Sequence, residues 1–203
     1  PSALALPKEL NDTPFMVEKV IDYISGQRNS WCVHLSLLRP HPPWIAPEPF
    51  NRMYPPAELM KFNRKESKVD EARQHPFLNE FLNKTGYQAP EDDKKLARLK
   101  ASYFGLMSEV DQNLGVLFDY LKKNNFWNNT LIIFTSDHGE QIGDHWLLGK
   151  LGYFDESYHI PLIIRDPNNH QNKGKIIEEY TENVDVMPTM LDWFDLPLPV
   201  QCD

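Results

Sequence analysis

The chain has 203 residues, of which 41% are hydrophobic and 12% aromatic, which is enough for one folded domain with a substantial core. Its 21 Lys and Arg against 29 Asp and Glu residues give a net charge of −8. Binding to a nucleic-acid backbone needs clustered cations, so this balance argues against a nucleic-acid partner. A small anionic substrate stays compatible, because a metal ion and a few local cations can override the overall field. No apolar stretch reaches the roughly 18 residues that a membrane span requires.

The N-terminal part of the sequence predicts a helix, a strand and a long irregular segment. Asn11-Asp12-Thr13 can cap a helix that begins near Pro14. An apolar run at 31–38 predicts a buried strand. Residues 39–56 hold seven of the 17 prolines, and charged residues follow up to position 73. We therefore interpret 39–75 as a Pro-rich and charged loop insertion in a single domain, 1–203.

The second half of the sequence alternates helical and strand patterns. From 91 to 124, apolar residues recur at steps of three and four, which predicts a long amphipathic helix. The runs 130–135 and 160–165 are apolar without alternation, which is typical of strands covered on both faces. A helical segment follows at 185–194. This pattern predicts an α/β fold, a three-layer sandwich with a largely parallel central sheet and helices on both faces.

Polar side chains follow two of the predicted strands. Arg39 and His41 come after the run 31–38, whereas Asp137, His138 and Glu140 come after 130–135. In open α/β sheets, binding sites form outside the carboxyl ends of the strands. The sequence therefore places its candidate site where these two groups of residues would meet.

The Asp137-His138 pair is the strongest local signal for a metal site. A carboxylate beside an imidazole suits Mn²⁺, Fe²⁺ or Zn²⁺, and the carboxylate also suits Ca²⁺. Gly139 supplies a permissive backbone for the turn that would let both side chains face one ion. The alternative is that Asp137 caps the turn and His138 has no role in binding.

Several motifs occur in a fixed order around this pair: TSDHGE at 135–140, GDHWLLGK at 143–150, a short acidic segment, and IPLIIR at 160–165. With RPHPPW at 39–44, they resemble the sulfatase branch of the alkaline phosphatase superfamily, and most of all its phosphonate monoester hydrolases and arylsulfatases. The resemblance spans most of 31–195. It implies an alkaline-phosphatase-like fold that is incomplete at its N-terminal side.

The resemblance also implies roles for individual residues. Asp137 and His138 would bind one divalent metal ion, with Mn²⁺ or Ca²⁺ expected and Zn²⁺ or Fe²⁺ left open. Lys150 would contact the oxygens of the transferred group, and His41 would protonate the leaving oxygen of a small anionic ester. Arg39 and His145 would bind substrate, although Arg39 could instead order its loop and His145 could instead pack.

The family's nucleophile, a formylglycine made from Cys or a Ser, is followed two residues later by Pro and a further two residues later by Arg. Neither Cys32 nor Cys202 has this context, so we expect the nucleophile upstream of Pro1. The resemblance therefore implies the central-to-C-terminal part of a hydrolase of sulfate esters or phosphate and phosphonate esters, inactive when alone. A catalytically dead binding module and a phosphoryl transferase or mutase remain as alternatives, and homo-oligomerisation is left open.

Overall fold

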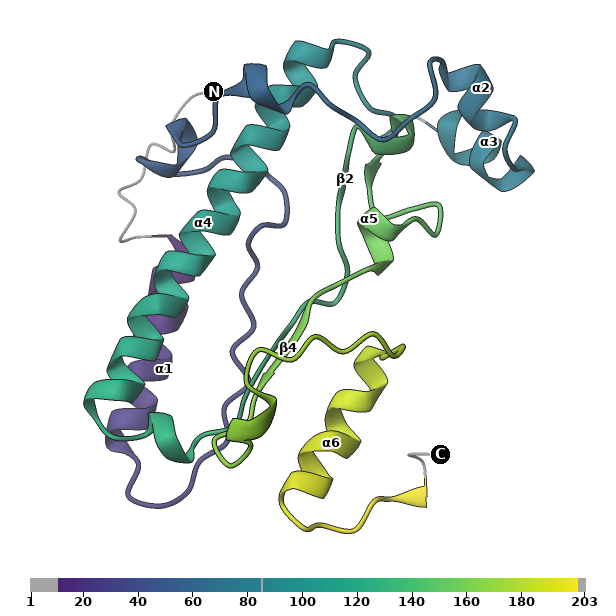
Figure 1. Cartoon of the computed structure of the whole chain (residues 1–203). Coiled ribbons are helices and arrows are strands. Elements are labelled where there is room, and N and C mark those ends of the chain that lie inside the picture. The colour runs from purple at the N-terminus through teal and green to yellow at the C-terminus, as the bar shows by residue number, and fades with distance from the viewer. Residues whose placement is uncertain (1–10, 85, 201–203) are drawn as a thin grey trace.

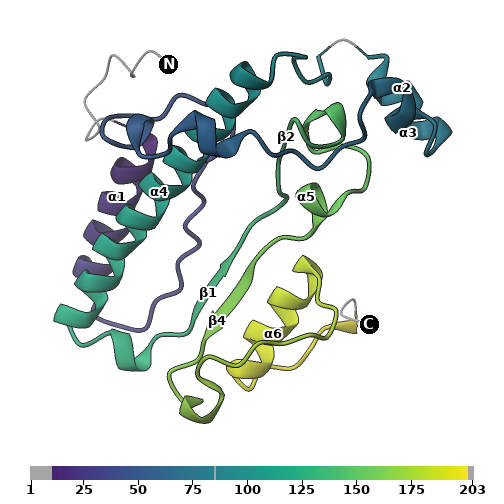
Figure 2. The same ribbon diagram turned by 45° about the horizontal axis from the view of Figure 1, so that its top comes forward.

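Two long helices and a pair of short strands organise the chain, of which the computed structural model describes residues 11–84 and 86–200. Helices α1 (Asp12–Gly26) and α4 (Asp93–Lys123) lie side by side. Strands β1 (Ile132–Thr135) and β4 (Leu162–Arg165) pair with each other. In two views this pair lies between the α1–α4 layer and helix α6 (Val186–Trp193), as Figures 1 and 2 show. The predicted α/β class with helices on both faces is confirmed.

Shorter elements fill the connections between these layers. Helices α2 (Lys68–Ala72) and α3 (Pro76–Leu82) lie together at the far end of the molecule from the β1–β4 pair. After β1, the chain forms the hairpin β2 (Gln141–Ile142) and β3 (Leu148–Gly149), then helix α5 (Asp155–Tyr158). None of the helices in the described ranges is long and apolar enough to cross a lipid bilayer.

Helix α4 confirms the prediction made for 91–124 and shows why the helix forms there. The side chain of Asp92 accepts hydrogen bonds from the backbone N–H groups of Lys94 and Lys95, at 2.9 and 3.3 Å, which satisfies two donors of the first turn. Lys122 and Lys123 lie in the last turn, where positive charge interacts favourably with the helix dipole.

Helix α1 begins close to its predicted start, but its first turn is held differently from the prediction. Asn11 occupies the N-cap position without a side-chain capping bond. Its amide instead donates to Oε1 of the buried Glu109 on α4, at 3.3 Å. The polar residue expected to cap one helix therefore joins two helices.

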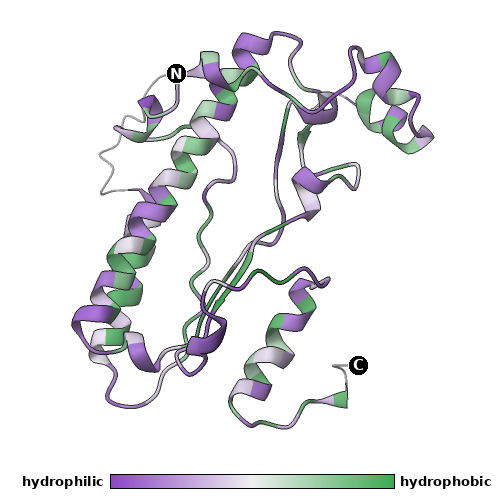
Figure 3. Ribbon diagram, viewed as in Figure 1, coloured by the Kyte–Doolittle hydropathy of each residue, from purple (hydrophilic) through white to green (hydrophobic). Residues whose placement is uncertain are grey.

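The main hydrophobic core lies along the seam between α1 and α4. Its buried members are Val17 and Ile24 from α1 with Leu117 and Leu121 from α4. Figure 3 shows hydrophobic residues along this seam and along the β1–β4 pair. Burying one such side chain stabilises the fold by about 1.5–3 kcal/mol, so the two helices form a stable platform for the loops above them.

Two predictions about strands were wrong. Residues 31–38 alternate between half-buried and exposed positions, as an extended segment does, but no strand pairs with them within the described ranges. Strands β1 and β4 pair antiparallel, with Ile132 opposite Arg165, in place of the parallel arrangement expected. The connection between them is a hairpin and one short helix. This short connection starts where β1 ends, so β4 runs back along β1 in the opposite direction. Parallel pairing would need a longer crossover that carries the chain back to the end where β1 begins.

The predicted insertion at 39–75 is more ordered than its composition indicates. It contains α2 and two 3-10 turns, Phe50–Arg52 and Pro56–Leu59, both packed on α4. Phe50 is buried there with Ala46 and Leu106. Glu71 in the charged stretch is only 1% exposed, so that stretch is not uniformly on the surface.

Candidate functional site

Asp137 and His138 lie in the loop that leaves β1, and their side chains face each other. Nε2 of His138 is 3.4 Å from Oδ2 of Asp137. The other ring nitrogen, Nδ1, lies 2.8 Å from the carbonyl oxygen of Gly139. A carbonyl can only accept, so Nδ1 carries the proton of the neutral ring and Nε2 keeps its lone pair. A ring held this way is typical of a metal-binding histidine.

Contacts from two other segments hold this loop in place. The N–H of Gly139 donates to the carbonyl of Ser157 in α5, at 2.8 Å. A Cβ atom on Gly139 would collide with the carbonyl oxygen of Glu156. Gly139 is therefore needed for close approach of two backbones and does not adopt a positive φ, which corrects the reason given for it from sequence. Asn183 adds a third support, since its amide donates to the carbonyl of Ser136 at 2.9 Å.

The donor set of this pair fits half of a metal site. A separation of 3.4 Å lets one oxygen and one nitrogen both reach an ion at their usual bond lengths of about 2.0–2.2 Å. The Asp137 side chain is 84% exposed, so its carboxylate is open to an ion. Across 11–84 and 86–200, no group of three or more His, Cys, Asp or Glu side chains is arranged to hold a metal.

Lys150 reaches the same region from the β2–β3 hairpin. The hairpin pairs Gln141 with Gly149 and Ile142 with Leu148. Glu140 precedes Gln141 and Lys150 follows Gly149, so both residues adjoin the same end of this ladder. The Glu140 carboxylate lies along the hairpin, with Oε1 3.8 Å from the place where a Cβ of Gly149 would be.

The charges around Glu140 show that the predicted residues come together. Burial raises the pKa of the Glu140 carboxyl, and the charge of Lys150, followed by the charges that His138 and His41 carry when protonated, opposes the rise. Charges act this way only over short distances through a partly desolvated region. We call these four residues the Glu140 cluster. It unites the loop after β1, the hairpin and the Pro-rich loop, which are far apart in sequence.

Tyr103 on α4 is close enough to Glu140 for the two groups to influence each other electrostatically. Burial raises the pKa of its phenol, and the charge of Glu140 raises it further. Neither residue was assigned a role from sequence. Tyr103 belonged to the apolar stripe of the long helix, and Glu140 to the motif around the metal pair, so only the fold could show that they meet.

His41 and Arg39 are both in the Pro-rich loop, but they have different environments. Nδ1 of His41 lies 2.9 Å from the carbonyl of Pro42, so its Nε2 is left for a ligand. Arg39 points the other way. Its Nε pairs with Asp12 at 3.3 Å, and its Nη1 donates to the carbonyls of His41 and Pro43. This geometry favours the alternative in which Arg39 orders the loop that carries His41, in place of the predicted substrate contact.

His145 also has a structural environment. Its Nδ1 is 2.9 Å from Glu71 and its Nε2 is 3.3 Å from Glu156, and the ring stacks on Phe154 at 3.5 Å. Both ring nitrogens therefore face carboxylates, and the side chain is only 13% exposed. The packing alternative is favoured over the predicted role in substrate binding.

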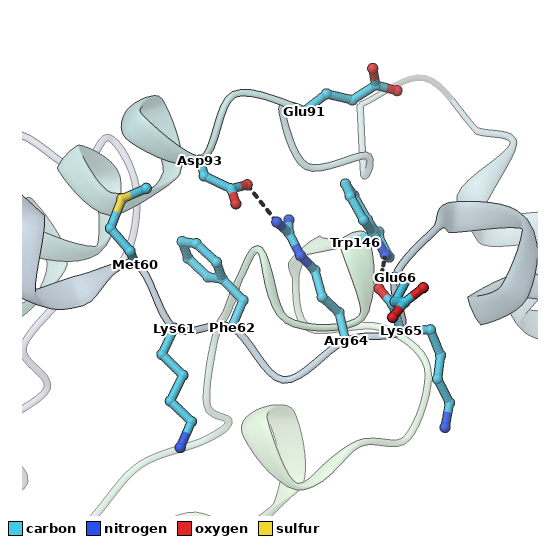
Figure 4. A pocket seen from close by; sticks show the side chains of 9 residues that line it. All are labelled: Met60, Lys61, Phe62, Arg64, Lys65, Glu66, Glu91, Asp93 and Trp146. Atoms are coloured by element: carbon cyan, nitrogen blue, oxygen red, sulfur yellow. Dashed lines mark hydrogen bonds and ion pairs between the residues drawn. The ribbon is translucent and has the colours of Figure 1, made fainter.

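An open hollow of about 520 Å³ lies beside this histidine turn and is lined by none of the predicted site residues. Figure 4 shows Arg64 at its centre, paired with Asp93 and stacked between two aromatic rings. The rings belong to Phe62 and Trp146, with centroids 4.9 and 3.8 Å from the guanidinium carbon. Because the charge of Arg64 is already compensated, this hollow is a packing feature of the loop and not part of the candidate site.

Comparison with known proteins places this site in a family. The sequence model of the family described as Sulfatase matches residues 8–196. The chain belongs to the sulfatase family. That membership agrees with the resemblance found in its motifs and with the alkaline phosphatase superfamily to which its relatives belong.

Individual relatives match almost the whole chain but only part of their own length. The "Multifunctional alkaline phosphatase superfamily protein PehA" of Trinickia caryophylli is 40% identical over 209 aligned residues, covering 98% of this chain and 41% of the relative. An arylsulfatase of Clostridium perfringens is 29% identical, covering 95% and 40%. The chain thus spans about two fifths of the length of these relatives.

Solved structures give the same result. The phosphonate monoester hydrolase of Agrobacterium radiobacter superposes with a TM-score of 0.90 at 38% identity, over 96% of this chain and 41% of that one. The phosphonate monoester hydrolase SpPMH of Silicibacter pomeroyi also gives 0.90, at 36% identity, over 98% and 40%. The described fold is therefore that of part of an alkaline-phosphatase-like hydrolase.

Proposed function

We propose that these residues form part of a metal-dependent hydrolase of sulfate esters or phosphate and phosphonate esters. The observation that carries the proposal is the Asp137–His138 pair, whose facing oxygen and nitrogen lie 3.4 Å apart, with Lys150 and His41 near the same loop. Membership of the sulfatase family and the named activities of the relatives support it. The complete protein that carries this chain would have the activity, with a formylglycine or Ser nucleophile outside the chain.

The chemistry needs positive charge around the transferred group. One divalent ion held by Asp137 and His138 would stabilise negative charge on the oxygens of the sulfuryl or phosphoryl group. Lys150 would donate hydrogen bonds from Nζ to the non-bridging oxygens, where charge is spread in the transition state. This assignment fits a half-buried lysine whose charge acts on Glu140 and that makes no ion pair among the described residues.

His41 would act as the general acid. Its Nδ1 is held by the carbonyl of Pro42, so an Nε2 proton on the charged ring is free to pass to the leaving oxygen. Arg39 keeps this loop in place through its three contacts with Asp12 and the loop carbonyls. Proton transfer of this kind contributes about 10²–10⁴-fold to a rate.

The test is turnover by the complete protein with p-nitrophenyl sulfate and with phenylphosphonate esters, in the presence of Mn²⁺ or Ca²⁺. Lys150→Ala is expected to lower kcat by about 10²–10³-fold, the cost of removing one donor to a developing oxyanion. His41→Gln should slow esters of poorly acidic phenols more than p-nitrophenyl esters, because p-nitrophenolate leaves without a proton. His170→Gln, a change at an exposed histidine, is the matched control.

Three results would reject the proposal or limit it. No turnover by the complete metal-loaded protein would favour the catalytically dead binding module. Transfer of a phosphoryl group to a second substrate in place of water would favour the transferase or mutase. Full activity of Lys150→Ala would remove the assigned role of that lysine. We also predict that the chain of 203 residues alone has no substantial turnover.

A further inference from the structure

Two side chains from different segments hold the carboxylate of Glu156, in the first turn of α5. The amide of Asn63 donates to Oε1 of Glu156 at 2.9 Å, and Nε2 of His145 lies 3.3 Å from Oε2. The backbone N–H of His145 also donates to the carbonyl of Asn63, at 2.8 Å. Burial would raise the pKa of the Glu156 carboxyl, but the bond from Asn63, its own backbone N–H and the charge of His145 together lower it.

The other ring nitrogen of His145 reaches a second carboxylate. Nδ1 lies 2.9 Å from Oε1 of Glu71, which is buried in α2. In the described ranges Glu71 also accepts hydrogen bonds from the N–H of Lys65 and the amide of Gln74, each at 2.6 Å. Carboxyl oxygens whose partners all donate belong to an ionised group. An uncharged ring has only one N–H, so this geometry is that of an imidazolium between Glu71 and Glu156.

The turn that carries His145 has an unfavourable backbone. His145 and Trp146 both have a positive φ, 52° and 60°, in the left-handed region that residues with a Cβ rarely adopt. Such a conformation persists only where its surroundings hold it. Nε1 of Trp146 donates to the carbonyl of Lys65 at 3.0 Å, and the ring stacks on Arg64. The contacts of Trp146 and of His145 therefore fix the turn between β2 and β3.

Glu156 connects this turn to the loop of Asp137 and His138. Its backbone carbonyl is the group that a Cβ on Gly139 would meet, and the next carbonyl, that of Ser157, accepts the N–H of Gly139 at 2.8 Å. The carbonyl of Gly139 in turn lies 2.8 Å from Nδ1 of His138. A displacement of α5 would therefore move the backbone that orients the ring of His138.

We propose that His145 is a positioning residue for the metal site, because it fixes Glu156 and with it the α5 backbone on which the loop of Asp137 and His138 rests. This inference rests on the metal-binding role proposed above for that loop. His145 touches neither the metal nor the substrate. Its contact with Glu156 leads to the metal site, whereas its contact with Glu71 leads to α2, on the other side of the ring.

The test uses the complete protein, freed of metal, and the variants His145→Gln, Glu156→Gln and Glu71→Gln. Glu18→Gln, at an exposed site on α1, is the control for the loss of one carboxylate. Titration with Mn²⁺ is done well below every thermal midpoint, so that a change in stability alone does not alter the Kd. We expect His145→Gln and Glu156→Gln each to raise the Kd by about tenfold, the lower end of the usual cost of losing support for a metal ligand. Glu71→Gln should lower the thermal midpoint and change the Kd by less than about threefold.

A double variant and two further measurements separate positioning from catalysis. With His145→Gln and Glu156→Gln combined, the Kd should stay within about threefold of the weaker single variant, because both changes break one contact. Saturating Mn²⁺ should restore kcat of His145→Gln to within about threefold of the unmodified value, since His145 takes no part in the reaction. Hydrogen exchange of the metal-free protein should be faster for the peptide containing Gly139 in both single variants, and not in Glu71→Gln.

Every outcome supports or overturns the inference. An unchanged Kd and unchanged exchange at Gly139 in both His145→Gln and Glu156→Gln would show that it is wrong. It is also wrong if Glu71→Gln raises the Kd as much as Glu156→Gln, because His145 would then act through general stability. If the unmodified protein binds neither Mn²⁺ nor Ca²⁺, the proposed function fails, and hydrogen exchange at Gly139 still decides whether His145 orders the loop.

Discussion

Gly105 and Gly115 lie on the same helix, but replacing each of them with Ala should change the free energy of unfolding in opposite directions. A Cβ on Gly105 would lie 2.5 Å from the carbonyl oxygen of Phe50 and 3.1 Å from the Cβ of Ala46. A Cβ on Gly115 would have no heavy atom within 4 Å. Both glycines are inside α4, Asp93–Lys123, where Ala is favoured over Gly by about 0.8–1.0 kcal/mol.

The magnitudes follow from those distances. Gly115→Ala should keep the whole gain in helix propensity and raise the free energy of unfolding by up to about 1 kcal/mol. Gly105→Ala gains the same amount but pushes against backbone, which cannot rotate away as a side chain can. Overpacking of this kind costs about 1–3 kcal/mol, so a net loss of about 1 kcal/mol is expected.

The assay is chemical denaturation of the two variants and the unmodified protein, with the midpoints compared at a constant slope. Turnover is measured alongside, because Phe50 and Ala46 continue the loop that begins at Arg39 and His41. Gly105→Ala should therefore also lower activity, whereas Gly115→Ala should not. Equal gains in stability for both variants would show that the close approach of the loop to α4 is not real.

Three further predictions concern the surroundings of the site. Gly139→Ala should reduce metal affinity and turnover together, because its Cβ would collide with the carbonyl of Glu156; metal titration measures this, and unchanged affinity would contradict it. Burial, more than any neighbouring charge, raises the pKa of Glu109 above its usual 4.5, so the folded state loses stability as pH rises from about 4.5 through that raised value. Glu109→Gln should therefore be the more stable form near pH 7 and lose this advantage below about pH 4, as melting curves at several pH values would show. His145→Gln should lower the free energy of unfolding by about 1–3 kcal/mol, because the buried carboxylate of Glu71 loses its partner Nδ1 of His145; no change in the denaturation midpoint would count against this.

The helices were predictable from sequence because their signals are local. The stripe at 91–124 has a period that only a helix satisfies, and α4 confirmed it over Asp93–Lys123. Strand pairing is not local in this sense. The run 31–38 has the apolar character of a strand, and Trp31, Val33 and Leu35 do pack on the core, yet whether it pairs depends on a neighbour that the run itself does not specify.

For the candidate site too, the residue types were predictable from local motifs, whereas the contacts of each side chain were not. Asp137, His138, Lys150 and His41 were predicted from motifs, and the structure brings Lys150, His138 and His41 to one carboxylate. Arg39 and His145 also have side chains that could bind an anionic substrate, but in the structure they bind carboxylates of the protein. Arg39 pairs with Asp12 on α1, and His145 lies between Glu71 and Glu156. A motif records which residue types occur and cannot record which way each side chain points.

Glu140 shows the opposite case, a residue whose surroundings only the fold reveals. In the sequence it is one of 29 acidic residues and lies ten positions before Lys150. In the structure its Oε1 lies 3.8 Å from the position that a Cβ of Gly149 would take, at the end of the β2–β3 ladder. Lys150, His138 and His41 influence the pKa of its carboxyl there, although they come from three segments of the chain. Strand register and loop packing therefore gather the candidate site, and neither can be read from the spacing of the motifs.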